Sequence, residues 1–416
     1  MKLKMMFRVL TTQIRFSIAA SELFSFLLMT LALTLLPFSR TQAMGLLMRS
    51  HRNTRKLRRQ LFIESIYKKF HLNSLEVVTR LFPKRIYVDR IYERRVFKLK
   101  EPRGKEKGVL LMKYSDTAAK VMLRYDLNKI MQDYYLVIEP SFSGYCTAEV
   151  LSLMELKGTK SLIQCPHKTD YDFIMRAGRS LVPVETGSNS WVDDRVFTDL
   201  SLPKEYDCIM VALWGDIKRH YLLFEAMEKI NDPGYRVCLI GGPWGRLQKD
   251  IEELAEYYGV RDRIDFFEKL PPAKVNRLLN KSKVNALLSL KEGANKAIVE
   301  GFFANVPALA MEENLAIGTS YINEFTGRLT SREKLAETLL WFRDNYRSFQ
   351  PRKWALDNIA PKISTAKIEE TLKAIAAERG EPWTRSLVAK VNRPECEYYH
   401  PEEALSPLDL SLYSKQ

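Results

Sequence analysis

The sequence predicts an α/β protein built from two doubly wound parallel sheets. Short apolar runs recur from residue 108 to residue 310, segments of helical period separate them, and an irregular stretch containing Pro203 divides the series near residues 198–205. Continuous apolar runs are typical of strands buried on both faces, and strands that alternate with helices form parallel sheets. We therefore expect two Rossmann-like lobes with a cleft between them, in which ligands bind beyond the carboxyl ends of the strands.

The expected strands fall into two groups. Those of the first lobe are residues 108–112, 135–139, 161–165 and 180–184. Those of the second lobe are residues 207–213, 236–240, 264–267, 284–290 and 306–310. Segments of helical period follow several strands, as at residues 220–230 and 247–258, and the clearest helix near the end of the chain covers roughly residues 364–379.

This pattern divides the chain into four parts. They are a basic and apolar leader or membrane anchor at 1–44, a first lobe at 45–202 with a basic helical part (45–106) and a Rossmann-like part (107–202), a second lobe at 203–350, and a tail at 351–416 that packs across both lobes. The six prolines of the tail distinguish it from the lobes.

Composition excludes several classes of protein. The chain has 416 residues, of which 46% are hydrophobic and 28% charged, so it is neither disordered nor collagen-like. Its five cysteines, at residues 146, 165, 208, 238 and 396, are odd in number and widely spaced. They offer neither a paired disulfide framework nor a C-x-x-C metal site, so we expect a reducing compartment and no bound metal.

Positive charge is concentrated near the N-terminus. The net charge is +15, and residues 1–106 carry 23 Lys and Arg against 7 Asp and Glu, whereas the rest carries 42 against 43. The densest run lies between Arg49 and Arg59, and a second run at 85–100 interleaves aromatic residues with cations. Such charge attracts anionic lipid or nucleic acid, and the plain alternative is a solvated helical face. No nucleic-acid-binding motif accompanies it, which favours an anionic membrane surface contacting residues 16–59.

One segment is strongly apolar. Leu23 to Leu36 is free of charge, and the segment extends over residues 16–38 if Glu22 is included. It is interpreted as a signal anchor or interfacial helix, as a cleaved signal peptide, or as a buried or artefactual leader, since Met44 and Met48 offer later starts. If the segment spans, the basic residues that follow place the rest on the cytoplasmic side of a membrane; otherwise the chain is a soluble cytoplasmic protein.

The stretch at residues 289–310 carries the clearest sign of chemistry. It reads SLKEGANKAIVEGFFANVPALA. We expect a strand that ends at Leu290, a loop over 291–294, a helix from about Asn295 to Ala304, and a new strand opened by Pro307.

The start of this expected helix suits a phosphate group. Asn295 is a typical N-cap residue, and the amides of residues 293–297 then lack partners inside the helix. The helix dipole makes these amides favour an anion, and Gly293 lets the backbone approach it closely. Glu292 and Glu300, eight residues apart, can face the same ligand. A carboxylate is suited to holding the vicinal hydroxyls of a sugar or ribose because it accepts two hydrogen bonds at once.

The same stretch resembles the Glu-x7-Glu segment of retaining nucleotide-sugar glycosyltransferases of the group 1, or family 4, type. The residues that match the family pattern are Glu292, Gly293, Glu300 and Pro307. Gly301 replaces the usual Ala, and Asn305 replaces the usual Gly, which is a mild change because Asn tolerates a left-handed backbone. The resemblance covers about residues 187–345.

Other family landmarks follow in order. Residues 189–197 resemble the segment that ends the first lobe, and residues 211–220 resemble the strand and loop whose Lys contacts the donor diphosphate, which is Lys218 here. The family's Arg before that Lys is missing, and Arg219 is the candidate substitute. Gly242 lies in the matching glycine turn after the next strand. In the first lobe, the family's glycine-rich loop is missing at residues 113–120.

The resemblance implies a GT-B fold and retaining transfer of a sugar from a nucleoside diphosphate sugar. It implies no metal and no cofactor besides the donor. It assigns catalytic roles to Glu292, which holds the donor sugar, and His167, which lies near the transferred sugar. The residues that it assigns to donor binding are Lys218, Arg219, Gly242, Gly293, Ala294, Asn295, Lys296 and Glu300.

The acceptor is expected to be a carbohydrate or a lipid-linked sugar in polysaccharide or glycolipid assembly. Two other functions stay open from the sequence. One is a nucleotide-sugar-binding protein without activity on the same fold, favoured by the missing Arg and glycine loop. The other is a nucleic-acid-binding protein built on residues 45–106.

Overall fold

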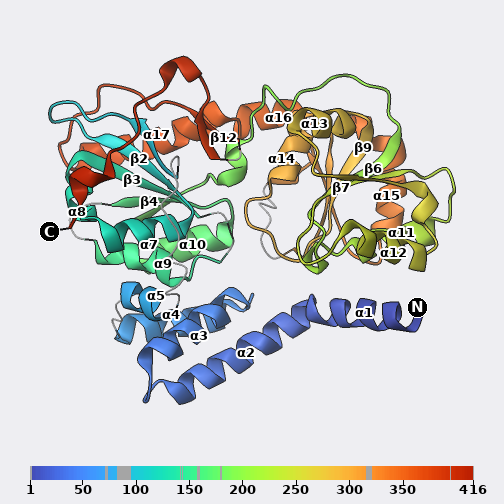
Figure 1. Ribbon diagram of the computed structural model, residues 1–416, viewed down its shortest axis with the longest axis horizontal. Coiled ribbons are helices and arrows are strands. Elements are labelled where there is room, and N and C mark those ends of the chain that lie inside the picture. The colour runs from blue at the N-terminus through green and yellow to red at the C-terminus, as the bar shows by residue number, and fades with distance from the viewer. Residues whose placement is uncertain are drawn as a thin grey trace. The chain divides into compact units, whose positions relative to one another are not determined.

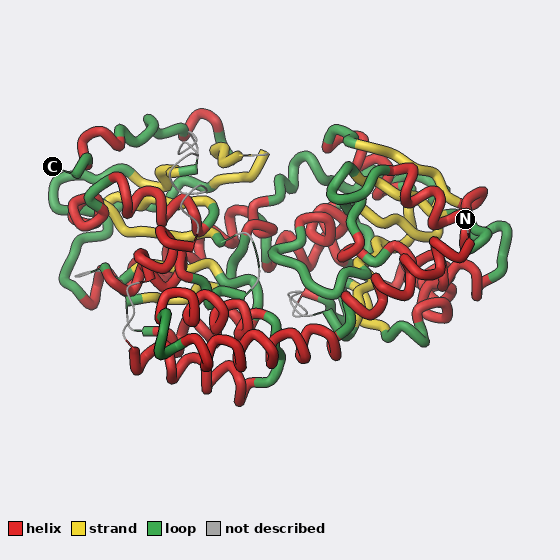
Figure 2. Tube along the Cα trace, turned by 60° about the horizontal axis from the view of Figure 1, so that its bottom comes forward, coloured by secondary structure: helices red, strands yellow, loops and turns green. Residues whose placement is uncertain are grey.

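The computed structural model describes residues 2–70, 74–81, 95–140, 142, 144–156, 160–178, 180–314, 321–393 and 395–415 (Figure 1). The chain divides into two compact units. We call Ser21–Trp191 with Pro361–Gln416 the first lobe, and Met1–Ala20 with Val192–Ala360 the second lobe. Each lobe is an α/β unit with helices on both faces of its sheet (Figure 2).

The sheet of the first lobe has the order β1-β2-β3-β4-β5. Its strands are β1 (Val96–Lys100), β2 (Gly108–Lys113), β3 (Tyr134–Glu139), β4 (Ser161–Gln164) and β5 (Leu181–Val184). The four strands β2 to β5 are parallel, which confirms the sequence prediction. The antiparallel edge strand β1 was not predicted.

Strand β1 was missed because its lysines suggest a solvated surface. In the structure, Lys98 and Lys100 are buried and paired: the Lys98 Nζ lies 2.5 Å from Glu101 and the Lys100 Nζ lies 2.7 Å from Glu106. The expected basic helical part at residues 45–106 therefore also contains a strand. Most of the basic run at 85–100 lies outside the described residues.

Helices cover the first sheet on two faces. One group consists of α2 (Ile18–Leu35), α3 (Arg40–Arg52), α4 (Leu57–Phe70), α5 (Ser74–Leu81), α7 (Ser115–Arg124), α8 (Leu127–Asp133), α9 (Ala148–Leu151) and α10 (Lys168–Ala177). Ala32, Met44 and Ile63 of this group share one hydrophobic core with Leu110 and Ile163 of the sheet. Among the described residues, α2 is the one helix whose length and apolar composition would suit a membrane crossing. It is the N-terminal apolar helix that the sequence predicts.

The other face of the first sheet is covered by the tail. Helix α17 (Pro361–Glu378) packs Ile368 and Leu372 against Val109 and Tyr135 of the sheet. The hairpin of β12 (Lys390–Arg393) and β13 (Glu395–Tyr398) follows. Residues 361–416 therefore belong to the first lobe, and α16 (Pro351–Asn358) to the second.

The sheet of the second lobe is entirely parallel, with the order β11-β10-β9-β6-β7-β8. Its strands are β6 (Tyr206–Val211), β7 (Val237–Gly241), β8 (Ile264–Glu268), β9 (Ser282–Leu287), β10 (Ala308–Met311) and β11 (Gly327–Thr330), the last of which was not predicted. The other helices of this lobe are α1 (Lys2–Arg15), α11 (His220–Ile230), α12 (Gln248–Tyr257), α13 (Pro272–Asn280), α14 (Lys296–Phe303) and α15 (Leu335–Asn345).

The strand order of the second lobe determines where a ligand can bind. Strand β6 comes first along the chain and pairs with β7 on one side and with β9 on the other. The order of the strands therefore reverses between β6 and β9. In doubly wound sheets, the loops that follow two such strands separate at the carboxyl edge and leave a crevice in which ligands bind.

Candidate active site

Two loops leave the carboxyl edge of the second sheet at its switch point. Residues 212–219 follow β6, and residues 288–295 follow β9, which is its direct neighbour in the sheet. Because adjacent parallel strands end at the same edge, the loops after them lie side by side. Five of the candidate donor-binding residues lie on these two loops, together with Glu292: Lys218, Arg219, Gly293, Ala294 and Asn295.

The two loops are joined by an ion pair between predicted site residues. The Nζ of Lys218 lies 2.5 Å from Oε1 of Glu292, and their side chains are 15% and 10% exposed. The structure thus brings together a cation suited to a diphosphate and a carboxylate suited to sugar hydroxyls, 74 residues apart in the chain. Both groups keep some contact with solvent, so a ligand can reach them.

Arg219 lies beside Lys218 but is largely engaged inside the loops. Its backbone is left-handed, with φ of 55°, and its side chain is 3% exposed. The guanidinium Nε donates to the carbonyl of Leu288 at 2.6 Å, and Nη1 donates to Glu313. The buried Nη2 finds no hydrogen-bond acceptor among the described residues. The Nη2 group of Arg219 therefore has unused capacity to donate, which is unusual because a buried polar group without a partner is costly.

The loop after β7 is tied to the loop after β6. Arg246 donates to both carboxylate oxygens of Asp216, at 3.0 and 2.8 Å. Gly242 is buried in this loop, and an added Cβ there would make only ordinary contacts. At Gly241, in contrast, a Cβ would lie 2.6 Å from the carbonyl oxygen of Ala212. The close approach of the two loops thus depends on Gly241, which sequence reasoning did not select, and the donor contact of Gly242 stays a prediction.

The segment before helix α14 largely follows the prediction. Strand β9 ends at Leu287, three residues before the predicted end at Leu290, so the loop is longer than expected. The helix begins at Lys296, and the side chain of Asn295 accepts a hydrogen bond from the Ile298 amide at 3.0 Å, which confirms it as the N-cap. Gly293, Ala294 and Lys296 lie at this helix start and are partly exposed. Their contacts with a phosphate stay predictions.

The two departures from the family pattern have structural reasons. Asn305 follows the end of α14 with φ of 60°, which confirms the expected left-handed residue, and its side chain donates to Asp199 at 2.8 Å. At Gly301, an added Cβ would lie 2.8 Å from Nδ2 of Asn285. That amide donates to the carbonyl of Ala297, so a side chain at position 301 would push against a bond that fixes the helix.

Glu300 lies in the second turn of α14 and is half-buried. Desolvation raises the pKa of its carboxyl to about 7, and the Lys296 ammonium opposes this rise. A carboxyl with such a pKa changes charge near neutral pH. Strongly shifted pKa values are typical of binding and catalytic groups, because the fold holds them where a ligand and not water satisfies them.

His167 lies in the first lobe, at the N-cap of α10, and is 4% exposed. It follows β4 closely, so it lies at the carboxyl edge of the first sheet, as predicted. The ion pair and loop contacts described above belong to the second lobe alone. The catalytic role of His167 stays a prediction.

Two residues of the second lobe were missed by sequence reasoning. Glu313, which follows β10 closely, pairs with Arg219. Ser289, in the loop after β9, is fully buried, and its hydroxyl has no hydrogen-bond partner among the described residues. Both residues follow strands closely, and this position was the one feature of the sequence that could have identified them. Among the described residues, no group of three or more His, Cys, Asp or Glu is arranged to hold a metal ion.

Comparisons with known proteins agree on the fold. Residues 196–348 match the family described as glycosyl transferases group 1. A glycosyltransferase from Rickettsia africae is similar in structure, with a TM-score of 0.51 and 15% identity, over 73% of this chain and 81% of that one. Among curated proteins, none matches this chain by sequence.

Two further solved structures are similar at a TM-score of 0.50. The Anabaena protein HepE in complex with UDP-glucose has 15% identity, over 64% of this chain and 78% of that one. The lipopolysaccharide outer core galactosyltransferase WaaB has 12% identity, over 64% of this chain and 75% of that one. At such low identity these likenesses show the fold, which is the GT-B type that the sequence predicts.

Proposed function

Because residues 196–348 match the family described as glycosyl transferases group 1, we propose that this chain transfers a glycosyl group from a nucleoside diphosphate sugar to an acceptor hydroxyl, with retention of the anomeric configuration. The observation that carries the proposal is the Lys218–Glu292 pair at the switch point of the second sheet. Such a pair offers a cation for the diphosphate and an acceptor for sugar hydroxyls on adjacent loops.

When the donor binds, it replaces the contact between Lys218 and Glu292 with contacts of its own. A diphosphate takes Lys218 away from Glu292, and the freed carboxylate accepts hydrogen bonds from the donor sugar. The buried Nη2 of Arg219 and the amides at the start of α14 add donors for the phosphate oxygens. Glu300, in the next turn, accepts from the ribose hydroxyls. HepE, a similar structure, binds UDP-glucose, and we propose a uridine donor of that class here.

Chemistry consists of breaking the bond between the anomeric carbon and the diphosphate oxygen. The bonding electrons leave with the diphosphate, whose growing charge is stabilised by Lys218 and by the helix start. The acceptor oxygen forms the new bond from the same face of the sugar, and its proton passes to the departing phosphate. Atoms and charge balance without a metal or a protein nucleophile.

Two further assignments concern His167 and the acceptor. We assign His167, at the carboxyl edge of the first sheet, to a position near the transferred sugar. The acceptor is a carbohydrate or lipid-linked sugar, a choice supported by the likeness to WaaB, which acts in the lipopolysaccharide outer core. The place of the reaction is then the cytoplasmic side of a membrane.

The direct test uses a panel of nucleoside diphosphate sugars offered with acceptors from membrane extracts, with products identified by mass spectrometry. We expect one donor to be consumed and Glu300→Gln to abolish transfer while the fold persists. Glu337→Gln, an exposed carboxylate on α15, is the matched control and keeps full activity. Donor-dependent shifts in melting temperature without turnover would favour the inactive binder instead.

The Lys218 assignment has its own test. Lys218→Gln removes the charge that faces the diphosphate, and we expect the Kd for the nucleoside diphosphate to rise about tenfold, the size of one charge-assisted hydrogen bond. Lys229→Gln, on the neighbouring helix α11 with its side chain 50% exposed, is the control. Calorimetric titration of both variants measures the change, and equal Kd values for them would overturn the assignment.

A further inference from the structure

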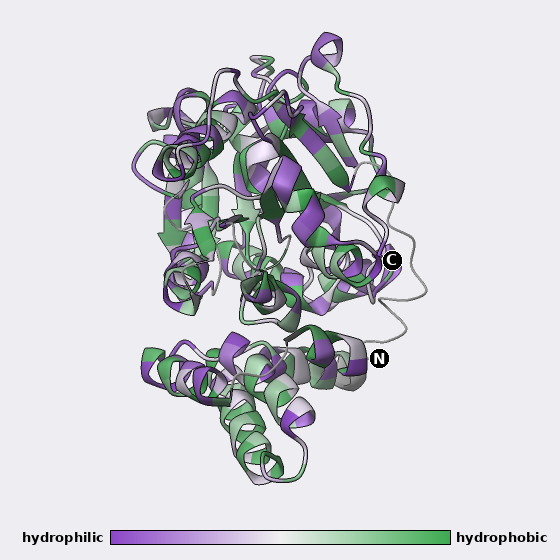
Figure 3. Cartoon of the chain, turned by 90° about the vertical axis from the view of Figure 1, so that its left-hand side faces the viewer, coloured by the Kyte–Doolittle hydropathy of each residue, from purple (hydrophilic) through white to green (hydrophobic). Residues whose placement is uncertain are grey.

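Helices α2 and α4 of the first lobe present an unusually apolar outer surface. On α2, the exposed residues Leu23, Phe24, Phe26, Leu27, Leu31 and Leu33 are between 37% and 59% exposed. On α4, Leu57, Leu61 and Phe62 are between 42% and 53% exposed. We call these nine residues the apolar surface; Figure 3 colours apolar residues green. Large groups of exposed apolar residues on a soluble protein mark a binding surface.

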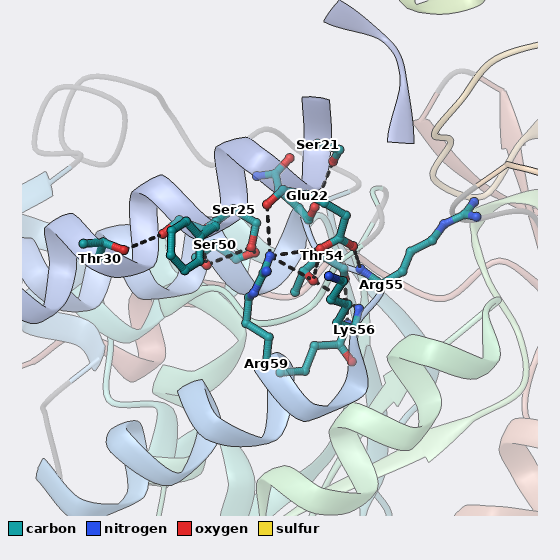
Figure 4. A network of polar contacts seen from close by, with 12 residues as sticks. Ser21, Glu22, Ser25, Thr30, Ser50, Thr54, Arg55, Lys56 and Arg59 are labelled. Atoms are coloured by element: carbon teal, nitrogen blue, oxygen red, sulfur yellow. Dashed lines mark hydrogen bonds and ion pairs between the residues drawn. The ribbon is translucent and has the colours of Figure 1, made fainter. Parts of the chain in front are cut away.

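The opposite face of α2 is fixed to the protein by polar contacts (Figure 4). Ser25 and Ser50 of α3 are fully buried, and each hydroxyl donates to the other's backbone carbonyl, at 2.9 and 2.7 Å. Ser21 donates to the carbonyl of Asn53 at 2.8 Å. Ala32 of the same face lies in the core of the first lobe. Helix α2 is therefore part of the folded lobe along one whole side.

The one carboxylate of α2 is also engaged inside the protein. Glu22 accepts from the Thr54 hydroxyl at 2.8 Å, from the Arg55 amide at 2.6 Å and from Arg59 at 2.9 Å. Arg59 also donates to the backbone carbonyl of Glu22 at 3.0 Å (Figure 4). These bonds hold the start of α2 against the turn before α4. They also neutralise the charge of the Glu22 carboxylate.

This attachment argues against a membrane crossing by α2. Its 18 residues give a length of about 27 Å, less than the roughly 30 Å of a bilayer core. A crossing would also require breaking the bonds of Glu22 and Ser25 or taking the charged residues of α3 and α4 into hydrocarbon, which is costly. A helix with one face fixed and one face apolar suits the interface instead.

The exposed charged residues between residues 21 and 70 are all of one sign. Between residues 21 and 70 the exposed cations are Arg40, Arg49, Arg55, Lys56, Arg58, Lys68 and Lys69. The acids in this range are Glu22 and Glu64, and both are paired within the protein. On α4, with 100° per residue, Leu57, Leu61 and Lys68 project within an arc of about 40°, so cations and apolar groups share one face.

We propose that α2 and α4 lie flat in the interface of an anionic membrane, and that the chain does not cross the bilayer. The nine apolar residues enter the boundary of the acyl chains, and the seven cations contact lipid phosphates. A nucleic acid would use the cations but leave six exposed leucines of α2 and α4 without a function, so lipid fits the surface better. The proposal is independent of catalysis, because membrane binding can be measured without a donor.

The first test is co-sedimentation of the full chain with vesicles of phosphatidylcholine, alone or with phosphatidylglycerol. We expect binding to the anionic vesicles, and at least a tenfold lower partition coefficient for the variant Leu27→Glu/Leu31→Glu. The control is Leu412→Glu, at a residue 74% exposed in the tail, which keeps wild-type binding. Equal binding of both variants would overturn the proposal.

The second test removes the cations. Arg58→Gln/Lys68→Gln/Lys69→Gln is expected to weaken binding to anionic vesicles at least tenfold, with little change on neutral ones. The matched control is Arg103→Gln/Lys105→Gln/Lys129→Gln, three exposed cations elsewhere in the first lobe. Tight, salt-dependent binding of single-stranded RNA with no binding to vesicles would assign the surface to nucleic acid and overturn the membrane proposal.

The third test distinguishes lying on the membrane from crossing it. All five native cysteines are buried, so cysteines introduced at exposed positions can be labelled selectively. Thr11→Cys, before α2, and Lys56→Cys, after it, are expressed in bacteria, and inverted membrane vesicles are treated with a membrane-impermeant maleimide. We expect both to be labelled without detergent. Protection of Thr11→Cys alone would show a crossing and reject the proposal.

Discussion

The two sheets place a Lys–Glu pair at their carboxyl edges and use it differently. In the first lobe, Glu139 at the end of β3 binds Lys390 of the tail at 2.7 Å, and both side chains are 0% exposed. In the second lobe, Lys218 and Glu292 lie on loops, 2.5 Å apart, and keep contact with water. The first pair is enclosed by the protein's own tail, whereas the second stays accessible to a ligand.

The closed pair is satisfied by the protein on every side. Asn392 donates to the second oxygen of Glu139 at 3.2 Å, and the Lys390 ammonium lies 4.4 Å from the centre of the Trp191 ring. In the second lobe, the loop of Lys218 also holds a buried guanidinium nitrogen of Arg219 without an acceptor among the described residues, and α14 holds Glu300 with a raised pKa. The difference teaches that a Lys–Glu pair at a strand edge indicates a binding site only where its charges stay accessible and are not enclosed by partners within the protein.

The largest expected effect comes from breaking the closed pair. Lys390→Met leaves Glu139 as an uncompensated charge in a dry interior, and we expect the free energy of unfolding to fall by about 3 to 5 kcal/mol. Urea denaturation followed by circular dichroism measures the loss.

Two further variants sharpen this prediction. Glu139→Gln/Lys390→Met removes both charges and is expected to recover most of the stability. Lys160→Met breaks the exposed pair with Glu378, whose side chains are 37% and 61% exposed, and is expected to cost less than about 1 kcal/mol. If Lys390→Met lowered the free energy of unfolding as little as Lys160→Met does, the Glu139–Lys390 pair would not be enclosed as described.

The sequence predicts the two sheets well because their strands are continuous apolar runs. The sequence does not predict features that depend on partners far away in the chain, such as buried ion pairs. Lys390 reaches Glu139 across 251 residues of chain, and nothing local in the tail distinguishes that lysine from a solvated one. Strand β1 was not predicted for the same reason, because the burial of Lys98 and Lys100 depends on their partners and not on their hydrophobicity.

The site was predicted where local rules apply. Asn295 as an N-cap and Asn305 as a left-handed residue follow from the chemistry of single side chains, and both are confirmed. The resemblance to a family assigned Lys218 and Glu292 separately to the donor, and their ion pair is a finding of the structure. The pairing of Arg219 with Glu313 could not be predicted, because it depends on how two loops 94 residues apart in sequence approach each other.

A smaller effect concerns the protonation of Glu300. With a pKa of about 7 in the fold and about 4.5 in the unfolded chain, the folded protein holds a proton that the unfolded chain has released between these values. The contribution of Glu300 to stability therefore falls as the pH rises from about 4.5 to 7, by roughly 1 to 3 kcal/mol, and stops changing above about pH 8. Glu300→Gln lacks this dependence, and thermal unfolding of both proteins across this pH range measures the difference.

Donor binding has the opposite dependence on pH. The ribose hydroxyls need the ionised carboxylate of Glu300, so affinity for the nucleoside diphosphate is expected to rise by up to about tenfold between pH 6 and pH 8. Calorimetric titration at each pH gives the curve, with Glu300→Gln as the control that stays flat apart from phosphate ionisation. Parallel curves for the two proteins would mean that Glu300 does not face the ligand, and the contrast between the two edges would weaken.

The smallest expected effect concerns the N-cap of α14. It tests whether the start of this helix is already ordered before the ligand binds. Asn295→Ala removes the side-chain acceptor of the Ile298 amide and is expected to lower the free energy of unfolding by about 1 kcal/mol. Asn295→Ser keeps an acceptor and is expected to lose less than half as much. Because the same cap orients the helix start toward the phosphate, Kd for the nucleoside diphosphate should rise a few-fold in the Ala variant and little in the Ser variant. A change in stability without a change in Kd would separate the cap from the site and leave Lys218 and Glu292 as the groups that bind.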